Sequence, residues 1–172
     1  MILEGERVRL RPAVREDLAA YTRWYTDDEF RKYIMEPPGE AFDALQSPRS
    51  NQLTFSVELL DGRLIGCVYI TDITTAHRHC ELALVAIGER DCWDKGYGSE
   101  MVRLALRFCF RELNMHQVHI STAEFNERAR RCYGAIFPHE QRHRQWSSSE
   151  GRFWDEIYFD ITEEEFNGSD SG

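Results

Sequence analysis

The stretch Glu81–Leu113 constrains the fold of this chain more than any other. It begins with a short, nearly continuous apolar run, ELALVAI, which is typical of a strand buried on both faces of a sheet. It ends with EMVRLALRFCFREL, whose apolar residues recur at the spacing of an amphipathic helix. Between the two lies KGYGS, which contains Gly96 and Gly98. The pattern therefore predicts a strand that leads through a glycine-rich turn directly into a helix.

A turn of this kind can hold a phosphate group. The first turn of a helix has N–H groups without partners in the helix, and the aligned peptide dipoles make that end partly positive. Glycine lets the backbone approach an anion without a Cβ in the way. The chain has no GxxxxGK[ST] motif, and Met101 stands where the dinucleotide-binding pattern GxGxxG needs its third glycine. Taken alone, GxG is also compatible with a plain tight turn.

Length and composition indicate one compact domain. The chain has 172 residues, of which 42% are hydrophobic and 12% aromatic. We expect a single domain over residues 1–166 and a frayed tail over 167–172. There is no apolar run long enough for a membrane helix, and the N-terminus does not resemble a targeting peptide, so we expect a cytoplasmic protein without a membrane partner. Five cysteines without a CxxC motif predict free thiols in a reducing compartment.

The formal net charge is −9, which argues against a nucleic-acid partner. An acidic surface attracts cationic partners such as a polyamine or a basic protein terminus, although acidity can also serve solubility alone. His77, His79 and Cys80 have no second ligand pair at a recognised spacing, so we expect no metal.

The remaining patterns predict an α+β fold with a mixed, mostly antiparallel central sheet of about seven strands and helices on both faces, in three α/β/α layers. In chain order we expect a strand at 8–12, helices at 16–25 and 28–34, strands at 53–59, 64–70 and 81–87, the long helix, a strand at 117–122, a short helix at 126–133, and strands at 139–146 and 152–161. The proline-rich segment 36–51 is the least regular, and because such loops often carry specificity we expect it to form the lip of the pocket that accepts the substrate.

The segments WDKGYGSEMVRLAL and NERARRCY resemble the GNAT superfamily of N-acetyltransferases, in particular the branch of ribosomal-protein-alanine and spermidine acetyltransferases. The resemblance extends from residue 7 to residue 161. It implies the fold described above, acetyl-CoA as co-substrate and a Q/R-x-x-G-x-G/A turn whose amides hold the pyrophosphate. Trp93 stands at the Q/R position of that turn. The implied coenzyme-binding residues of the turn are Trp93, Asp94, Lys95, Gly96, Tyr97, Gly98 and Ser99.

The resemblance also implies that two central strands splay apart and admit the pantetheine arm. Backbone groups near Val85, Ala86 and Ile87 would bond to the arm like a missing strand, and Asn126 would hold it. Tyr133 would act as the general acid towards the coenzyme A sulfur. After this tyrosine the family usually has x-K-x-G-F, whereas this chain has GAIFP and is one residue shorter.

Glu81 opens the buried strand and is the candidate general base, because an alkylamine arrives mostly protonated and must lose a proton before it attacks. The alternative is a structural carboxylate paired with an arginine. Direct attack of the amine in a ternary complex needs no covalent enzyme intermediate. Cys92 or Cys132 would act as a nucleophile only beside a base.

Two classes of function remain at this stage. The first is an acetyl-CoA-dependent N-acetyltransferase that acts on a primary amine, which is a protein N-terminus, a polyamine or another small amine. The second is an acyl-CoA-binding sensor with little turnover. The sequence leaves the acceptor and the oligomeric state open, and a homodimer is one of the assemblies it allows.

Overall fold

A computed structural model describes residues 1–34 and 50–169. Its centre is an eight-stranded sheet with the order β1-β2-β3-β4-β5-β6-β8-β7. The strands are β1 Leu3–Glu4, β2 Val8–Pro12, β3 Leu53–Leu59, β4 Leu64–Thr74, β5 His79–Ile87, β6 Gln117–Ala123, β7 His139–Ser149 and β8 Arg152–Thr162. All neighbours are antiparallel except β5 and β6, so the predicted mixed, mostly antiparallel sheet is confirmed. The short β1 adds one strand to the expected number.

Five α-helices accompany the described part of the sheet. They are α1 Leu18–Tyr25, α2 Asp28–Tyr33, α4 Tyr97–Arg111, α5 Glu127–Gly134 and α6 Glu163–Ser169. The sequence analysis did not predict α6, which continues to Ser169 and so covers the first three residues of the expected tail. Nearly all of the expected pocket lip at 36–51 lies outside the described residues. None of the described helices combines the length and the apolar character needed to span a membrane.

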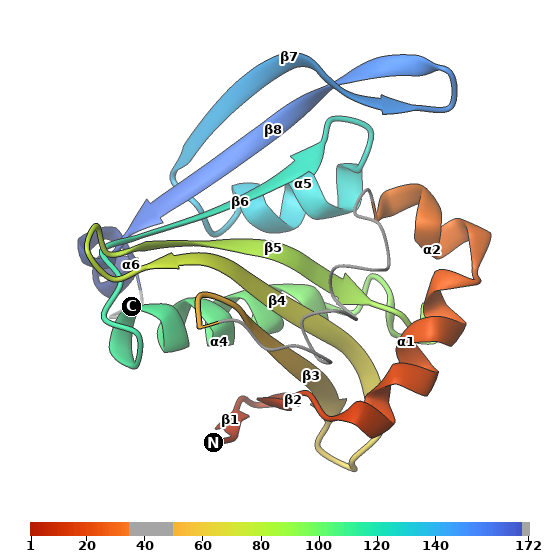
Figure 1. Ribbon diagram of the computed structural model, residues 1–172, viewed down its shortest axis with the longest axis horizontal. Helices are drawn as coiled ribbons and strands as arrows, with labels where there is room; N and C mark the ends of the chain where they lie inside the picture. Colours follow the sequence, from red (N-terminus) through yellow and green to blue (C-terminus); the bar gives the residue numbers. More distant parts are fainter. Residues whose placement is uncertain (35–49, 170–172) are drawn as a thin grey trace.

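Two apolar clusters on opposite faces of the sheet confirm the three-layer arrangement. Val68 and Ile70 of β4 belong to the cluster that contains the buried face of α4. Cys67 and Tyr69, which alternate with them, belong to the cluster that contains α1 and Phe30 of α2. Since successive side chains of a strand point to opposite faces, a strand that is apolar at every position needs cover on both sides. The three layers provide that cover (Figure 1).

The sheet splits between β5 and β6. The two strands pair only from His79 to Glu81 on β5 and from Gln117 to His119 on β6. In Figure 1 they run together near α6 and diverge towards α1 and α2. An irregularity in β5 accompanies the split, because Leu82 and Leu84 pair with the adjacent residues Ile70 and Tyr69 of β4 and leave Ala83 as an extra residue. The gap implied by the family resemblance is therefore present.

Contacts at the end of β5 hold α1 and α2 beside this gap. The indole Nε1 of Trp24 donates to Glu89 Oε1 at 2.8 Å, and Arg90 Nε donates to Asp27 Oδ2 at 2.7 Å. A Cβ at Gly88 would lie 1.9 Å from the ring of Trp24, so this position requires glycine. As a result, α1 and the start of α2 are fixed beside the open part of the sheet.

Candidate active site

The glycine turn gives α4 an accessible N-terminus. Gly96 is the residue before the first helical residue and has a φ of +81°, a left-handed conformation that favours glycine. A Cβ at Gly98 would meet no atom closer than Ile87 Cδ1 at 4.0 Å, so the space in front of this position is open. The amides of the first turn therefore face a space that an anion can enter.

Arg7 supports the turn from the side of β2, a role that the sequence analysis missed. Its Nη1 donates to the carbonyl of Lys95 at 2.9 Å, and its Nε lies 3.0 Å from Glu100 Oε2. The guanidinium group also lies 5.1 Å from the centre of the Tyr97 ring. The side chain of Tyr97 is thus packed against Arg7 and is not among the residues that line the cleft described next. Only its backbone remains a candidate for coenzyme binding.

A cleft of about 470 Å³ lies in front of the turn and is lined by the end of β5, residues 93–99, α5 and α2. All the site residues expected from the sequence line it except Tyr97 and Glu81. Additional lining residues are Phe30, Tyr33 and Ile34 at α2, and Arg128, Ala129, Arg131 and Cys132 on α5.

Cationic side chains give this cleft a positive character. Lys95, Arg128 and Arg131 line it, and Asp94 is the one carboxylate among its described lining residues. Arg128 Nε donates to Asp94 Oδ1 at 3.0 Å, and its guanidinium group lies 4.4 Å from the centre of the Trp93 ring. Two cations therefore remain in excess, which suits a ligand that carries several phosphate charges.

Trp93, which stands at the Q/R position, closes the turn onto β5. Its Nε1 donates to the carbonyl of Ile87 at 2.7 Å. The amide of Gly88 donates to Ile65 in β4, and the carbonyl of Ala86 points towards Gly66 of β4. Because backbone groups alternate in direction along a strand, Val85 and Ile87 face the gap and Ala86 does not. Of the three residues expected to bond to the pantetheine arm, Val85 and Ile87 therefore direct backbone groups to the gap. The carbonyl of Ile87 already accepts from Trp93, so its amide is the group that remains.

Asn126 caps α5, with its Oδ1 accepting from the amide of Ala129 at 3.2 Å. This leaves the side-chain NH₂ group as the part that can donate to a ligand in the cleft. Ser99 and Cys132 meet across the same cleft, with Oγ and Sγ 3.4 Å apart.

Tyr133 is 6% exposed and packs edge-on against Phe137 and Phe159, with ring centres 6.3 and 5.9 Å away. Burial raises the pKa of its phenol, so the hydroxyl stays protonated well into the alkaline range. The shortened segment after it forms a tight end to α5, in which the amides of Ile136 and Phe137 donate to the carbonyl of Tyr133. Tyr133 therefore lines the cleft even though the segment after it is one residue shorter than the family pattern.

A second, smaller cleft of about 130 Å³ joins the first at Tyr133. The two share Tyr33, Ile34, Val85, Asn126, Ala129 and Tyr133, so they form one continuous groove. Glu81 lines the second cleft together with Ser121, Thr122 and Glu156. His119 Nε2 lies 3.7 Å from Glu81 Oε2, and the described contacts do not include the arginine partner that the structural alternative required.

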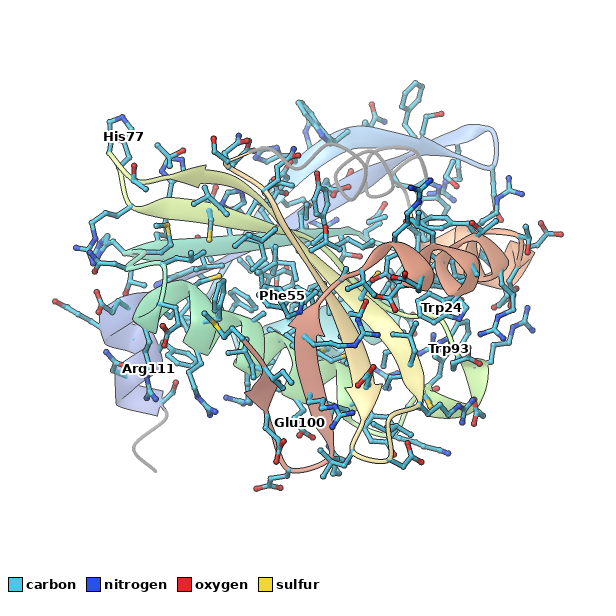
Figure 2. The ribbon with its side chains drawn as sticks, turned by 60° about the horizontal axis from the view of Figure 1, so that its bottom comes forward. Trp24, Phe55, His77, Trp93, Glu100 and Arg111 are labelled. Atoms are coloured by element: carbon cyan, nitrogen blue, oxygen red, sulfur yellow. The ribbon has the colours of Figure 1, made fainter. Side chains whose placement is uncertain are left out.

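The other chemistries considered from sequence find no support. Burial raises the pKa of the Cys92 thiol and also that of Cys132, so neither is an activated thiolate. The rings of His77 and His79 stack 6.2 Å apart, while Cys80 is buried. Figure 2 shows His77 at the opposite end of the molecule from Trp93. Among residues 1–34 and 50–169, no group of three or more His, Cys, Asp or Glu side chains is arranged to hold a metal.

Four of the lining residues that sequence reasoning missed are Arg128, Arg131, Tyr33 and Glu156. Arg128 and Arg131 are three positions apart on α5, within the segment that carries the family resemblance, and this spacing places them on one helix face. Tyr33 and Glu156 come from distant parts of the chain.

The groove is cationic at one end and acidic at the other. Such a groove suits the transfer of an acyl group from a phosphate-bearing donor to an amine. The class of protein that this arrangement indicates is an acyltransferase.

Comparisons with known proteins agree with this class. The acetyltransferase (GNAT) domain family matches residues 7–136. A spermidine N(1)-acetyltransferase from Vibrio cholerae is 27% identical over 135 residues, or 75% of this chain and 77% of that protein. YokL, an uncharacterized N-acetyltransferase from the SPbeta prophage of Bacillus subtilis, is 34% identical over 94% of this chain and 93% of that protein. The solved structure of the Vibrio cholerae enzyme has a TM-score of 0.81 at 23% identity and covers 95% of this chain and 99% of its own.

The chain belongs to the GNAT acetyltransferase family. It is an N-acetyltransferase that uses acetyl-CoA to acetylate an amine. The sensor alternative gains no support from these matches.

Proposed function

We propose that the acceptor is a linear amine with more than one positive charge, of the polyamine class. The observation that carries this proposal is the charge of the two joined clefts. The coenzyme cleft contains Lys95, Arg128 and Arg131, whereas the second cleft contains Glu81 and Glu156 and no lysine or arginine among its described lining residues. The matched enzymes from Vibrio cholerae and Escherichia coli are spermidine N(1)-acetyltransferases, and the Vibrio cholerae structure is a complex with CoA and spermine.

In the proposed mechanism the protein aligns two reactants and moves two protons. Acetyl-CoA supplies an activated thioester. The amides at Gly96–Ser99 and the three cations of the first cleft hold its phosphates, while Val85 and the NH₂ group of Asn126 bind its arm. Glu81 accepts the proton of the amine through water, and Tyr133 donates a proton to the departing sulfur. Alignment within one groove supplies roughly 7–11 kcal/mol of the barrier.

An amine panel tests the acceptor class. Purified protein is given acetyl-CoA, and release of free thiol is followed with spermidine, spermine, linear diamines, matched monoamines and a peptide with a basic N-terminus. We expect kcat/KM to be highest for the polyamines. A preference for the peptide would replace the polyamine by a protein N-terminus as the acceptor. Acetyl-CoA binding without thiol release for any amine would contradict the proposed acceptor class.

We expect Glu81→Gln to lower kcat by about 10²-fold and to leave the Kd for acetyl-CoA unchanged. Without the carboxylate, the reaction depends on the small fraction of amine that is already deprotonated. The residual rate should therefore rise with pH towards the amine pKa of about 10.4, whereas the wild-type rate levels off at lower pH. If Glu81 is only structural, the substitution will change thermal stability and leave the shape of the pH profile unaltered.

A further inference from the structure

We propose that His119 is the second member of the proton acceptor, and that the proton taken up by Glu81 comes to rest on its imidazole ring. The amine loses one proton, the carboxylate of Glu81 takes it up and passes it on, and the imidazole becomes an imidazolium ion. This inference rests on the proposed function and deepens its base step. His119 acts through Glu81 and is therefore a positioning residue.

The end of the pairing between β5 and β6 brings the two side chains together. Glu81 and His119 form the last pair of this parallel ladder before the strands diverge (Figure 1). Aligned residues of neighbouring strands point to the same face of a sheet, and His119 Nε2 lies 3.7 Å from Glu81 Oε2. Glu81 lines the second cleft, whereas His119 is not among the described residues that line either cleft. The carboxylate therefore lies between the acceptor and the imidazole.

The register of the sheet places a second carboxylate on the other side of His119. Asp160 of β8 pairs with His119, and its Oδ1 accepts a hydrogen bond from Gln117 Nε2 at 3.3 Å. Directly opposed side chains of antiparallel strands have Cβ atoms about 4.5–5.5 Å apart. A proton on His119 thus places its positive charge between two negative side chains. The side chain of His119 is 31% exposed, so water can reach the ring and remove the proton between turnovers.

The advantage of an imidazole is a larger driving force for removal of the proton. An alkylammonium ion has a pKa of about 10.4 and an isolated glutamate about 4.3, so transfer to a carboxylate alone is uphill by about six powers of ten. An imidazole has an ordinary pKa of about 6.5, which makes the same transfer roughly 100-fold less unfavourable. Since the efficiency of a general base rises with its affinity for the proton, the pair should be a more effective base than Glu81 alone.

Other titratable groups share this face of the sheet and supply a control. Besides the three already named, the register places there His79 of β5, Glu156 and Tyr158 of β8, and His139 and His143 of β7. Burial, followed by the charges of Glu156 and Glu81, raises the pKa of Tyr158, so this phenol stays neutral where imidazoles titrate. A hydrogen bond with Glu165 at 2.6 Å, and then the charges of Glu165 and Asp160, raise the pKa of His139. His139 is thus an imidazole of the same face whose hydrogen-bond partner is a carboxylate other than Glu81.

The test is the pH dependence of kcat/KM in the wild type and in His119→Gln, measured with spermidine or with whichever amine of the panel gives the highest kcat/KM. In the wild type we expect the rate to fall on acidification through the range in which an imidazole titrates. In His119→Gln the rate at about pH 8 should be roughly 10- to 100-fold lower, and its fall should begin about two pH units lower, where a carboxyl group titrates. A purely structural role would lower the rate without moving the acid limb.

The matched control is His139→Gln, which should leave the acid limb in its wild-type position. Glu81→Gln combined with His119→Gln should lose no more activity than Glu81→Gln alone, because His119 acts through the carboxylate. An unmoved limb in His119→Gln, an equal shift in His139→Gln or additive losses in the double variant would overturn the inference, while the role of Glu81 stands. If Glu81→Gln itself leaves kcat unchanged, the proposed base step fails and the inference fails with it. The amine panel decides the acceptor class independently of these results.

Discussion

Replacing Tyr133 by phenylalanine is expected to lower kcat by about 10- to 10⁴-fold and to leave the Kd for acetyl-CoA unchanged. Phenylalanine keeps the ring that packs against Phe137 and Phe159 and removes only the hydroxyl. Steady-state kinetics with a polyamine and calorimetric titration with acetyl-CoA measure the two quantities. A parallel loss of coenzyme binding and turnover would instead indicate that Tyr133 acts through packing.

The pH dependence of the wild type provides a further check on Tyr133. Burial disfavours the charged phenolate and so raises its pKa above the ordinary value of about 10. A general acid must be protonated, so ionisation of Tyr133 should cause no loss of activity at any pH below about 10. Phe159→Leu is the matched control, because it loosens the packing of Tyr133 but keeps the hydroxyl. It should lower stability by about 1–3 kcal/mol, as the removal of buried volume does, and reduce kcat far less than Tyr133→Phe.

The second large effect is expected for Gly98→Val, which should raise the Kd for acetyl-CoA by at least about 100-fold, or roughly 2.7 kcal/mol. The nearest atom to a Cβ at this position is 4.0 Å away, so the fold has room for the new side chain. Valine would instead fill the space through which a phosphate approaches the amides of α4. Calorimetric titration measures the affinity, and a thermal melt checks that the variant is folded.

Gly98→Ala is the graded comparison, and its smaller side chain should cost less affinity than valine. Normal binding of acetyl-CoA to both variants would mean that the pyrophosphate is held elsewhere in the cleft. Because binding is measured without an acceptor, this result is independent of the identity of the amine.

Local patterns predicted the parts of the fold that depend on neighbouring residues. The strand, turn and helix of Glu81–Leu113 follow from periodicity and glycine placement, and β5, Gly96 and α4 confirm them. The sequence analysis overlooked one local signal, which lies at the start of α6. Thr162 and Glu165 form reciprocal side-chain and backbone hydrogen bonds, which is the capping box that starts α6. Phe166 then buries that helix against Phe110.

The acceptor end of the groove could not be predicted in the same way. Tyr33, Glu81 and Glu156 meet there from three separate elements, and no spacing in the sequence relates them. Their proximity follows from the strand order, in which β8 lies between β6 and β7, and from the contacts of Asp27 with Arg90 and of Tyr33 with Trp93 that hold α2. Family resemblance supplied the split sheet and Tyr133, but it does not cover side chains that differ among relatives.

The short pairing of β5 with β6 places the two residues that we propose to move protons in different halves of the molecule. Glu81 belongs to the half built from β1 to β5, while Tyr133 rests on Phe159 in the half built from β6 to β8. In the sheet, three residue pairs join these halves. We therefore expect ligands that occupy both clefts to bridge this boundary and to hold the proposed proton acceptor and the proposed proton donor at one separation.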